Sequence, residues 1–339
     1  MDRPSNPDAS NHRILLTGAT GFVGSFVAPV LARCGHPLRL AVRDQGRVDP
    51  ALASLPNTDV FETGDLADDT PLDEAMQGVQ TVVHLAGLGH ILSGQPEEDA
   101  FMRSNAQATA NLAAAAQKAG AKRFIHLSSV AAIAPNSVSI VIDDRTDLSP
   151  QTPFARSKRA AEGHVQAFAE NREALAVSLR PPLIVGAAAR GNWALLQRLA
   201  ATGLPLPFGL ARNRRSVIDL ETLANAIAHL CETPPDPGLS GNYLITGSPA
   251  LALRDVIKAL RHGMGRGAGL LPVPTGLLVA LGTLAGRRRQ MSGLFGELLI
   301  DATRFTDTFG FQAPDRVAEA IEQSGRAFLK NRTARRSRH

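Results

Sequence analysis

The chain has 339 residues, which is enough for one large hydrophobic core or for a large domain with a smaller one attached. Apolar residues make up 44% and charged residues 20%, the range of ordinary globular proteins rather than disordered ones. The formal net charge is +5, and the chain contains one Trp, one Tyr and two cysteines, Cys34 and Cys231. This composition excludes a disulfide framework and argues against a base-stacking nucleic-acid module, so we expect no metal and no nucleic-acid partner.

Both ends of the chain differ from the rest. Residues 1–12 are polar and lack the apolar core of a signal peptide, so we expect a disordered N-terminus and a cytoplasmic protein. Residues 330–339 carry five Lys or Arg and no acid, and without them the formal net charge is zero. Two interpretations of this basic tail stay open: a solvated, disordered end, or a weak peripheral contact with an acidic membrane surface.

Short apolar runs alternate with helical patterns through the first half of the chain, which predicts a doubly wound parallel sheet of the α/β class. Strands are expected at residues 13–16, 38–42, 60–63, 81–86, 124–128 and 176–179. Helices are expected at residues 22–34, 97–119 and 154–170, with Gly35 and Gly120 as C-caps of the first two. We assign residues 13–185 to the domain that contains this sheet.

Beyond residue 185, Gly and Pro become frequent, and residues 186–329 are expected to form mainly a smaller mixed α/β domain that binds substrate at the carboxyl edge of the sheet. Helices are predicted there at residues 193–201 and 220–231. Residues 270–285 are strongly apolar and precede three arginines, but they contain two prolines and fall short of the roughly 20 residues that span a bilayer. We expect a buried or surface-docked helix, with an interfacial anchor as the alternative.

The sequence TGATGFVG at residues 17–24 directly follows the first predicted strand and opens the first predicted helix. Gly18 can adopt backbone angles closed to other residues, Gly21 lets the backbone approach a pyrophosphate, and Gly24 permits close packing of helix on strand. The free amides of the helix N-terminus would then face the phosphates. The loop therefore predicts a nicotinamide dinucleotide site whose contacts are Gly18, Thr20, Gly21, Phe22, Val23 and Gly24. It makes residues 13–185 a Rossmann-type dinucleotide-binding domain.

The end of the second predicted strand bears on the choice between NAD and NADP. A carboxylate there would accept hydrogen bonds from the adenosine ribose and repel a 2′-phosphate, but the strand ends in Val42 and Arg43. Arg43 is placed to pair with a 2′-phosphate, although Asp44 follows it directly. We predict that NADP is preferred over NAD.

Several motifs, in the same order, resemble the extended short-chain dehydrogenase/reductase superfamily, which includes the NAD-dependent epimerase/dehydratase family. They are TGATGFVG at 17–24, GDL at 64–66, HLAG at 84–87, NAQATANL at 105–112, SS at 128–129 and RPPL at 180–183. Besides the glycine loop and Arg43, the resemblance implies cofactor contacts at Asp65, Leu66, Ala86, Lys158 and Pro181. In similar proteins the helices corresponding to 97–119 and 154–170 pair in a homodimer, which we also expect here.

The active site of this superfamily combines a Ser with a Tyr that lies four residues before a Lys. The Lys holds the ribose and lowers the pKa of the Tyr, which exchanges a proton with the substrate oxygen that the Ser polarises. Here Ser129, with Ser128 as the alternative, and Lys158 match, but Phe154 occupies the Tyr position and cannot exchange a proton. Three interpretations stay open. Another proton donor serves, the chemistry is residual, or NADP binds without turnover; the candidate donors are Ser129 through a water chain, Thr152 and His90.

The second half of the chain resembles bacterial UDP-sugar 4-epimerases and 4-keto-sugar reductases of the same superfamily. In those enzymes an arginine in a run similar to residues 213–218 contacts the substrate diphosphate, which suits the paired donors of a guanidinium. The resemblance implies a nucleotide-sugar substrate bound by Arg215, with Arg214 as the second candidate, and by Asn192 and His90.

The resemblance favours a nucleotide-sugar oxidoreductase acting at C4 in polysaccharide biosynthesis, either an NADPH-dependent 4-keto-sugar reductase or a UDP-sugar 4-epimerase. Phe154 weighs more against the epimerase, which must both remove and return a proton. Two other hypotheses stay open: a non-catalytic NADP-binding scaffold or sensor of this fold, and a reductase of an apolar, sterol- or isoprenoid-like substrate.

Overall fold

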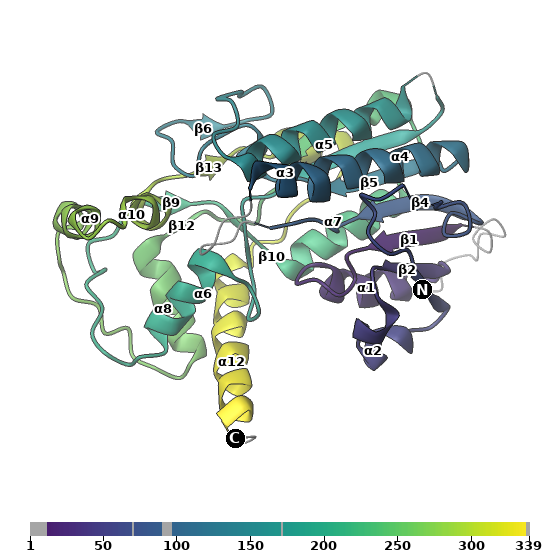
Figure 1. Cartoon of the computed structure of the whole chain (residues 1–339). Coiled ribbons are helices and arrows are strands. Elements are labelled where there is room, and N and C mark those ends of the chain that lie inside the picture. The colour runs from purple at the N-terminus through teal and green to yellow at the C-terminus, as the bar shows by residue number, and fades with distance from the viewer. Residues whose placement is uncertain (1–11, 70, 90–96, 171, 337–339) are drawn as a thin grey trace.

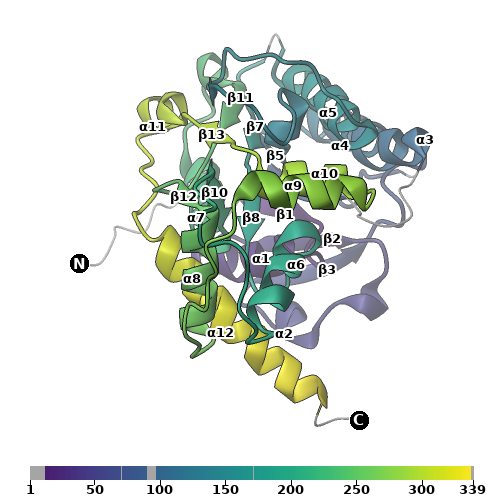
Figure 2. The ribbon, with the colours of Figure 1, turned by 90° about the vertical axis from the view of Figure 1, so that its left-hand side faces the viewer.

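The computed structural model describes residues 12–69, 71–89, 97–170 and 172–336. At its centre is a parallel seven-stranded sheet with the order β3–β2–β1–β4–β5–β7–β11 (Figures 1 and 2). In that order the strands are Thr58–Glu62, Leu38–Val42, Arg13–Thr17, Val79–His84, Arg123–Leu127, Leu175–Arg180 and Gly241–Leu244. The strand order reverses between β1 and β4, and open α/β sheets bind dinucleotides beyond the carboxyl ends of the strands at such a point.

Helices cover both faces of this sheet (Figure 1). On one face lie α1 (Gly24–Arg33) and α7 (Leu220–Glu232), and on the other lie α4 (Ala108–Lys118) and α5 (Pro153–Ala169). Because both faces are covered, burial does not alternate along these strands, and every residue of β2 and β7 is buried. The predicted doubly wound α/β class is confirmed.

The helix predicted at residues 97–119 is interrupted by a change of pitch. α3 (Glu98–Phe101) continues through a π-helical segment, Met102–Gln107, into α4. Such segments are rare and are frequent at functional sites. This one contains Asn105, a buried polar residue that faces the loop after β4.

After β7 the chain forms further elements, several of which surround a second apolar cluster that includes Trp193, Ile257 and Ile321. These elements are β8 (Leu183–Val185), α6 (Gly191–Ala200), β9 (Arg214–Arg215), β10 (Val217–Asp219), β12 (Leu251–Ala252), α8 (Leu253–Gly263), α9 (Thr275–Leu284), α10 (Arg288–Phe295), β13 (Leu299–Ile300), α11 (Thr303–Phe309) and α12 (Val317–Arg336). The chain also returns to the main sheet, because α7 covers it and β11 extends it beside β7.

Shorter connecting elements complete the description: α2 (Pro50–Ala53), β6 (Val141–Ile142) and 3₁₀ turns at Gln45–Arg47, Val130–Ala132 and Pro237–Leu239. No helix in the described parts of the chain combines the length and the apolarity needed to cross a membrane.

Two sequence predictions need correction. The basic tail is not a disordered end as far as Arg336, because α12 continues through it. This helix is anchored by its buried residues Val317, Ile321 and Ser324, and an anchored helix extends at little further free-energy cost.

The helix expected within residues 270–285 begins only at Thr275 and has no buried residue. It therefore lies on the surface, and the prediction of a buried helix was wrong. The predicted N-terminal disorder concerns residues outside those described, except His12, whose Nε2 lies 2.6 Å from Oγ1 of Thr81.

Candidate functional site

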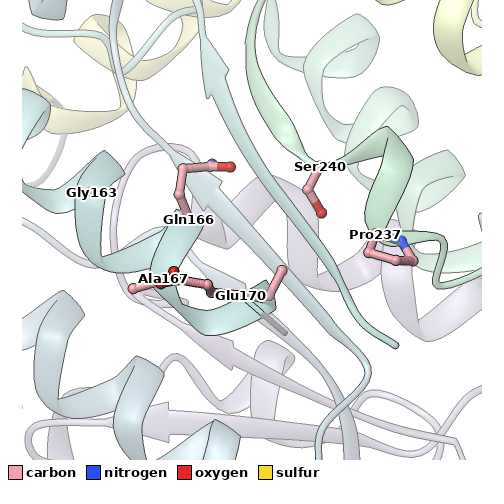
Figure 3. Close-up of a pocket in the computed structure, with 7 residues that line it drawn as sticks. Gly163, Gln166, Ala167, Glu170, Pro237 and Ser240 are labelled. Atoms are coloured by element: carbon pink, nitrogen blue, oxygen red, sulfur yellow. The ribbon is translucent and has the colours of Figure 1, made fainter. Parts of the chain in front are cut away.

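A surface hollow of about 420 Å³ lies between the second half of α5 and the segment 237–240 (Figure 3). It is lined by Gly163, Gln166, Ala167, Ala169, Glu170, Pro237 and Ser240. These residues belong to the end of α5 and to the segment that enters β11, so the hollow lies at the amino edge of the sheet. Ligands of open α/β sheets bind at the carboxyl edge, where the sequence motifs converge.

The glycine loop is packed so tightly that a side chain would not fit at Gly18 or at Gly24. Gly18 has a φ of +74°, and a Cβ there would lie 2.6 Å from the amide nitrogen of Ala86. A Cβ on Gly24 would lie 2.7 Å from the carbonyl carbon of Gly18 and would collide with its oxygen. α1 begins at this point with no acidic residue in its first turn and no side-chain cap. The loop and the helix N-terminus therefore have the form of a diphosphate cradle.

Buried hydrogen bonds fix the two strand ends beneath this cradle. Oγ1 of Thr17 lies 2.7 Å from Nδ1 of His84 and accepts a hydrogen bond from the amide of Ala86 at 3.2 Å. Nε2 of His84 lies 3.0 Å from Oγ1 of Thr109. Burial, assisted by the nearby Lys158 ammonium, lowers the pKa of His84 to about 3, so this imidazole is neutral.

The predicted adenosine end of the site contains two guanidinium groups and two carboxylates, because Arg103 also donates to Asp68. Arg43 and Arg103 approach Oδ2 of Asp65 at 3.7 and 3.9 Å. Asn111 donates to the carbonyl oxygen of Leu66 at 3.0 Å and so ties this segment to α4. The sequence prediction included Arg43, Asp65 and Leu66 but missed Arg103, which comes from the π-helical segment.

Asn105 joins three segments at the other end of the cradle. Its Oδ1 accepts a hydrogen bond from the amide of Leu88 at 2.7 Å, and its Nδ2 donates to Oγ of Ser157 at 2.9 Å. It thereby holds the loop after β4 against α5. A Cβ on Gly87, in the same loop, would lie 3.5 Å from Nζ of Lys158, so the loop passes directly over that lysine.

Lys158 is buried, with 8% of its surface exposed, and Nζ donates to the carbonyl oxygen of Leu127 at 2.7 Å. Burial lowers the pKa of Lys158 from 10.5 to about 8, while Glu162 acts in the opposite direction. The ammonium is therefore largely charged at neutral pH, at the carboxyl end of β5. Phe154 lies one turn earlier on α5, and its ring meets that of Phe101 edge-on with centroids 6.1 Å apart.

The two serines after β5 have different environments. Ser128 is buried, and its Oγ donates to Glu162 at 2.6 Å. Ser129 is partly exposed, and its Oγ accepts a hydrogen bond from the amide of Ala131 at 3.2 Å. Since a hydroxyl that accepts one bond still has its proton to donate, this arrangement favours Ser129 over Ser128 as the group that polarises a substrate oxygen.

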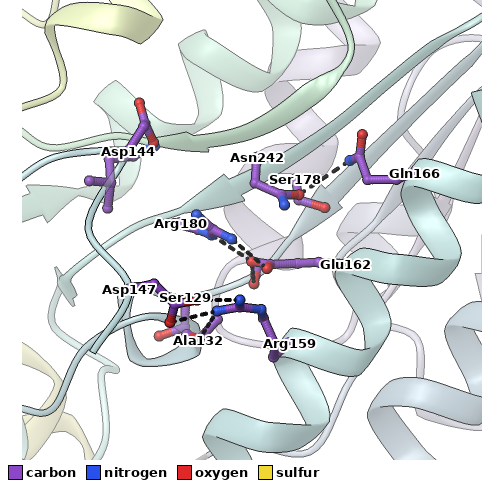
Figure 4. A network of polar contacts seen from close by, with 12 residues as sticks. Ser129, Ala132, Asp144, Asp147, Arg159, Glu162, Gln166, Ser178, Arg180 and Asn242 are labelled. Atoms are coloured by element: carbon purple, nitrogen blue, oxygen red, sulfur yellow. Dashed lines mark hydrogen bonds and ion pairs between the residues drawn. The ribbon is translucent and has the colours of Figure 1, made fainter. Parts of the chain in front are cut away.

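A buried ion pair beside these serines was missed by the sequence reasoning (Figure 4). Nε and one terminal nitrogen of Arg180 donate to the two carboxylate oxygens of Glu162 at 2.8 and 2.7 Å. Glu162 lies one turn after Lys158 on the face of α5 that carries Ala161 and Val165 into the core. In the sequence, the carboxylate on that apolar helix face was the sign that a buried partner of opposite charge would be present. The pair holds the start of the RPPL segment, in which the carbonyl oxygen of Pro181 accepts the amide of Val130 at 3.0 Å.

The alternative proton donors are either hydrogen-bonded elsewhere or lie outside the residues that the structure describes. Oγ1 of Thr152 accepts the amide of Ala155 at 3.1 Å and caps α5. His90 is outside the described residues. Tyr243, the single tyrosine of the chain, is buried among Phe305 and Phe309, and its hydroxyl donates to the carbonyl oxygen of Leu239 at 2.8 Å.

Arg215 and Asn192 line the same small recess, together with Gly293 and Leu294 of α10. Arg215 donates to the carbonyl oxygens of Gly296 and Asn136, both at 2.9 Å, and burial lowers its pKa to about 10. Within the described ranges no carboxylate forms an ion pair with it. The recess measures about 30 Å³, the space of one water, so a nucleotide sugar requires α6 and α10 to separate.

Comparison with known proteins places this geometry in a family. Residues 14–245 match the NAD dependent epimerase/dehydratase family. The chain belongs to that family. It is an NAD(P)-dependent enzyme of the oxidoreductase and epimerase class.

The relatives include enzymes that act on sugars and on lipids. The chain is 28% identical to the UDP-glucose 4-epimerase of Vibrio cholerae over 322 residues, which cover 94% of this chain and 95% of that enzyme. It is 34% identical to the ceramide reductase of Caulobacter vibrioides over 65% of this chain and 61% of that one. The structure of MoeE5 in complex with UDP-glucuronic acid and NAD has the same fold, with a TM-score of 0.73, 20% identity and coverage of 94% and 99% of the two chains.

Proposed function

We propose that the protein is an NADP-preferring oxidoreductase that acts at C4 of a nucleotide sugar in polysaccharide biosynthesis. Its similarity to UDP-glucose 4-epimerase along nearly the whole chain supports this proposal. The observation that carries the substrate class is Arg215. The Arg215 guanidinium is half-buried and has backbone carbonyl oxygens but no carboxylate as partners in the described structure, and a substrate diphosphate would compensate its charge.

The cradle fits a nicotinamide dinucleotide. Gly18, Thr20, Gly21, Phe22, Val23 and Gly24 would hold the diphosphate through backbone amides. Arg43 and Arg103 would meet a 2′-phosphate, while Asp65 and Leu66 would face the adenine and Ala86 and Pro181 would line the cofactor. The ammonium of Lys158 would donate to the ribose hydroxyls. When bound, the nicotinamide supplies or accepts the hydride.

Phe154 favours the reductase over the epimerase. In a reductase the hydroxyl of Ser129 would donate to the keto oxygen at C4, and water would supply the proton that the product alcohol needs. An epimerase must first remove a proton from the C4 hydroxyl, and Phe154 offers no base for this step. A 4-keto-sugar reductase is therefore our first proposal and a UDP-sugar 4-epimerase our second.

The substrate proposal is tested with UDP-4-keto-6-deoxy sugars and NADPH, following loss of NADPH absorbance. We expect turnover, and we expect Arg215→Ala to raise KM by at least about tenfold because charge-assisted bonds to the diphosphate are lost. Arg212→Ala is the matched control, since Arg212 is an exposed arginine of the same segment. Absence of NADPH oxidation at every enzyme concentration, or equal effects of the two variants, would overturn the proposal.

The substitution Phe154→Tyr separates a weak enzyme from a non-catalytic NADP-binding scaffold or sensor. A general acid or base typically contributes about 10²–10⁴-fold to a rate, so restoring the phenol next to Lys158 should give a gain within that range. Retained dinucleotide binding with no turnover in either protein would instead support the scaffold.

A reductase of an apolar substrate is a candidate function outside the nucleotide-sugar class. The similarity to ceramide reductase and the exposed apolar residues of α9 favour it. Such a substrate has no use for a diphosphate contact, so Arg215→Ala would leave its reduction intact.

We further propose a homodimer formed through α4 and α5, which light scattering of the purified protein would detect.

A further inference from the structure

α9 displays an apolar face to solvent. Leu277, Leu281 and Leu284 are 53%, 56% and 86% exposed. Their spacing of four and then three residues places them on one side of the helix. On the other side, Leu278 packs against the second apolar cluster together with Met291 of α10. The leucines at 277, 281 and 284 are thus not needed to hold α9 on the protein.

The chain that leads into α9, and the loop hydrogen-bonded to it, expose apolar side chains as well. Residues 206–209 run beside 269–271, with hydrogen bonds between the amide of Leu206 and the carbonyl of Gly269 and between the amide of Leu271 and the carbonyl of Leu206, both 2.8 Å. Large apolar side chains on these loops are exposed as well: Leu204 by 66%, Leu210 by 41% and Leu271 by 49%. We call these three residues and the three leucines of α9 the leucine face. Exposed apolar patches of this kind mark interaction surfaces.

α9 lies at one extremity of the molecule. In Figure 1, α9 is at the left edge, with α10 between it and the rest of the protein, and in Figure 2 both helices face the viewer. No part of the seven-stranded sheet or its covering helices lies in front of α9 in either view. A flat, extended partner can therefore reach it.

The charge of the surrounding sequence indicates what this partner is. Residues 256–296, which contain α9 and α10, include six Lys or Arg and no Asp or Glu. Residues 181–218, which contain Leu204 and Leu210, include five Arg, four of them exposed, and no acid. Arg287, directly after α9, is exposed. An apolar helix face bordered by basic residues complements a surface that is apolar inside and anionic at its rim.

A second copy of this chain fits less well. A symmetric contact through the leucine face would bring two acid-free, basic segments together, and like charges repel. An anionic lipid surface satisfies both the leucines and the arginines.

We propose that the leucine face docks on an anionic lipid surface, with α9 lying in the plane of the interface and Arg287 at the lipid phosphates. α10 packs beneath α9 and also lines the recess of Arg215, so docking would bring that recess close to the headgroups. The inference goes beyond the proposed function and does not depend on it.

Flotation of the full-length protein with vesicles tests the proposal. We expect the wild type to bind vesicles of phosphatidylglycerol and phosphatidylcholine, to bind pure phosphatidylcholine weakly, and to be released by salt. The triple variant Leu277→Asp, Leu281→Asp, Leu284→Asp should lower partitioning at least about tenfold, because it removes buried apolar area and adds repulsion. Leu148→Asp, at a 39% exposed leucine before α5, is the matched control and should bind like the wild type.

Arg287→Glu is a second test that stays valid if the triple variant misfolds, because it changes one exposed side chain. It should lower binding to anionic vesicles at least about fivefold. Melting temperature and dinucleotide uptake of each variant verify the fold. The proposal is overturned if the wild type does not bind, if it binds neutral and anionic vesicles equally, or if the triple variant binds normally. It is also overturned if light scattering shows a wild-type dimer that the leucine substitutions dissociate while vesicle binding is unchanged. No sugar substrate is present, so a negative result leaves the proposed function untouched.

Discussion

Replacing Lys158 by methionine should stabilise the free protein at neutral pH. The lysine is 8% exposed, and burial lowers its pKa from 10.5 to about 8. At about 1.4 kcal/mol for each pH unit, the burial of this charge opposes folding by roughly 3 kcal/mol below pH 8. Methionine has a similar length and no charge. It loses the hydrogen bond to the carbonyl of Leu127, which contributes roughly 1–2 kcal/mol, so the net stabilisation at pH 7 should be about 1–2 kcal/mol.

The sign of the pH dependence distinguishes this explanation from improved packing. Between pH 8 and 10.5 the unfolded lysine keeps its proton while the folded one loses it, so the free energy of unfolding of the wild type rises relative to the variant. The advantage of Lys158→Met should therefore vanish or reverse by pH 10. Urea unfolding of both proteins at pH 7 and pH 10, without dinucleotide, measures this. A variant less stable than the wild type at pH 7, or a difference that does not change with pH, would refute the reasoning.

Two further predictions concern charged residues. Glu162→Gln should destabilise the protein by roughly 3–5 kcal/mol in urea unfolding, because it leaves the buried guanidinium of Arg180 without its carboxylate. Asp73→Asn, in the exposed pair with Lys118, should cost less than about 1 kcal/mol; similar losses in the two variants would argue against burial as the cause. Arg43→Ala should reduce the preference for NADP over NAD at least about tenfold in calorimetric titrations, because it removes a donor to the 2′-phosphate. An equal change in both affinities would show that Arg43 does not meet the 2′-phosphate.

The sequence predicted those elements whose pattern is complete within one segment. β2 has its predicted bounds, because four of the five residues of Leu38–Val42 are apolar and all five are buried. β11 was not predicted, because only Tyr243 and Leu244 of its four residues are buried, and its pairing with β7 comes from the tertiary fold. The π-helical segment was also missed, since nothing in the helical periodicity distinguishes it from α4.

In the candidate site, too, the residues of one continuous motif could be predicted, and those that meet through the tertiary fold could not. The glycine loop could be predicted because strand, turn and helix follow one another directly, and the structure shows the close packing that requires Gly18 and Gly24. Arg103 and Glu162 could not be placed from motifs. Their roles arise from contacts with Asp65 and Arg180, which are distant in the sequence and meet only in the folded chain.

The central claim is that the glycine loop holds a nicotinamide dinucleotide by its diphosphate. Calorimetric titration of NADPH and NADH into the wild type, Gly24→Ala and Gly163→Ala tests it most directly. A Cβ on Gly24 would collide with the backbone of Gly18, whereas one on Gly163 would meet nothing within 4 Å. We predict one dinucleotide per chain for the wild type and Gly163→Ala, and a loss of affinity of at least about tenfold for Gly24→Ala. A wild type that takes up neither dinucleotide, or a Gly24→Ala variant that binds as tightly as Gly163→Ala, would contradict the account.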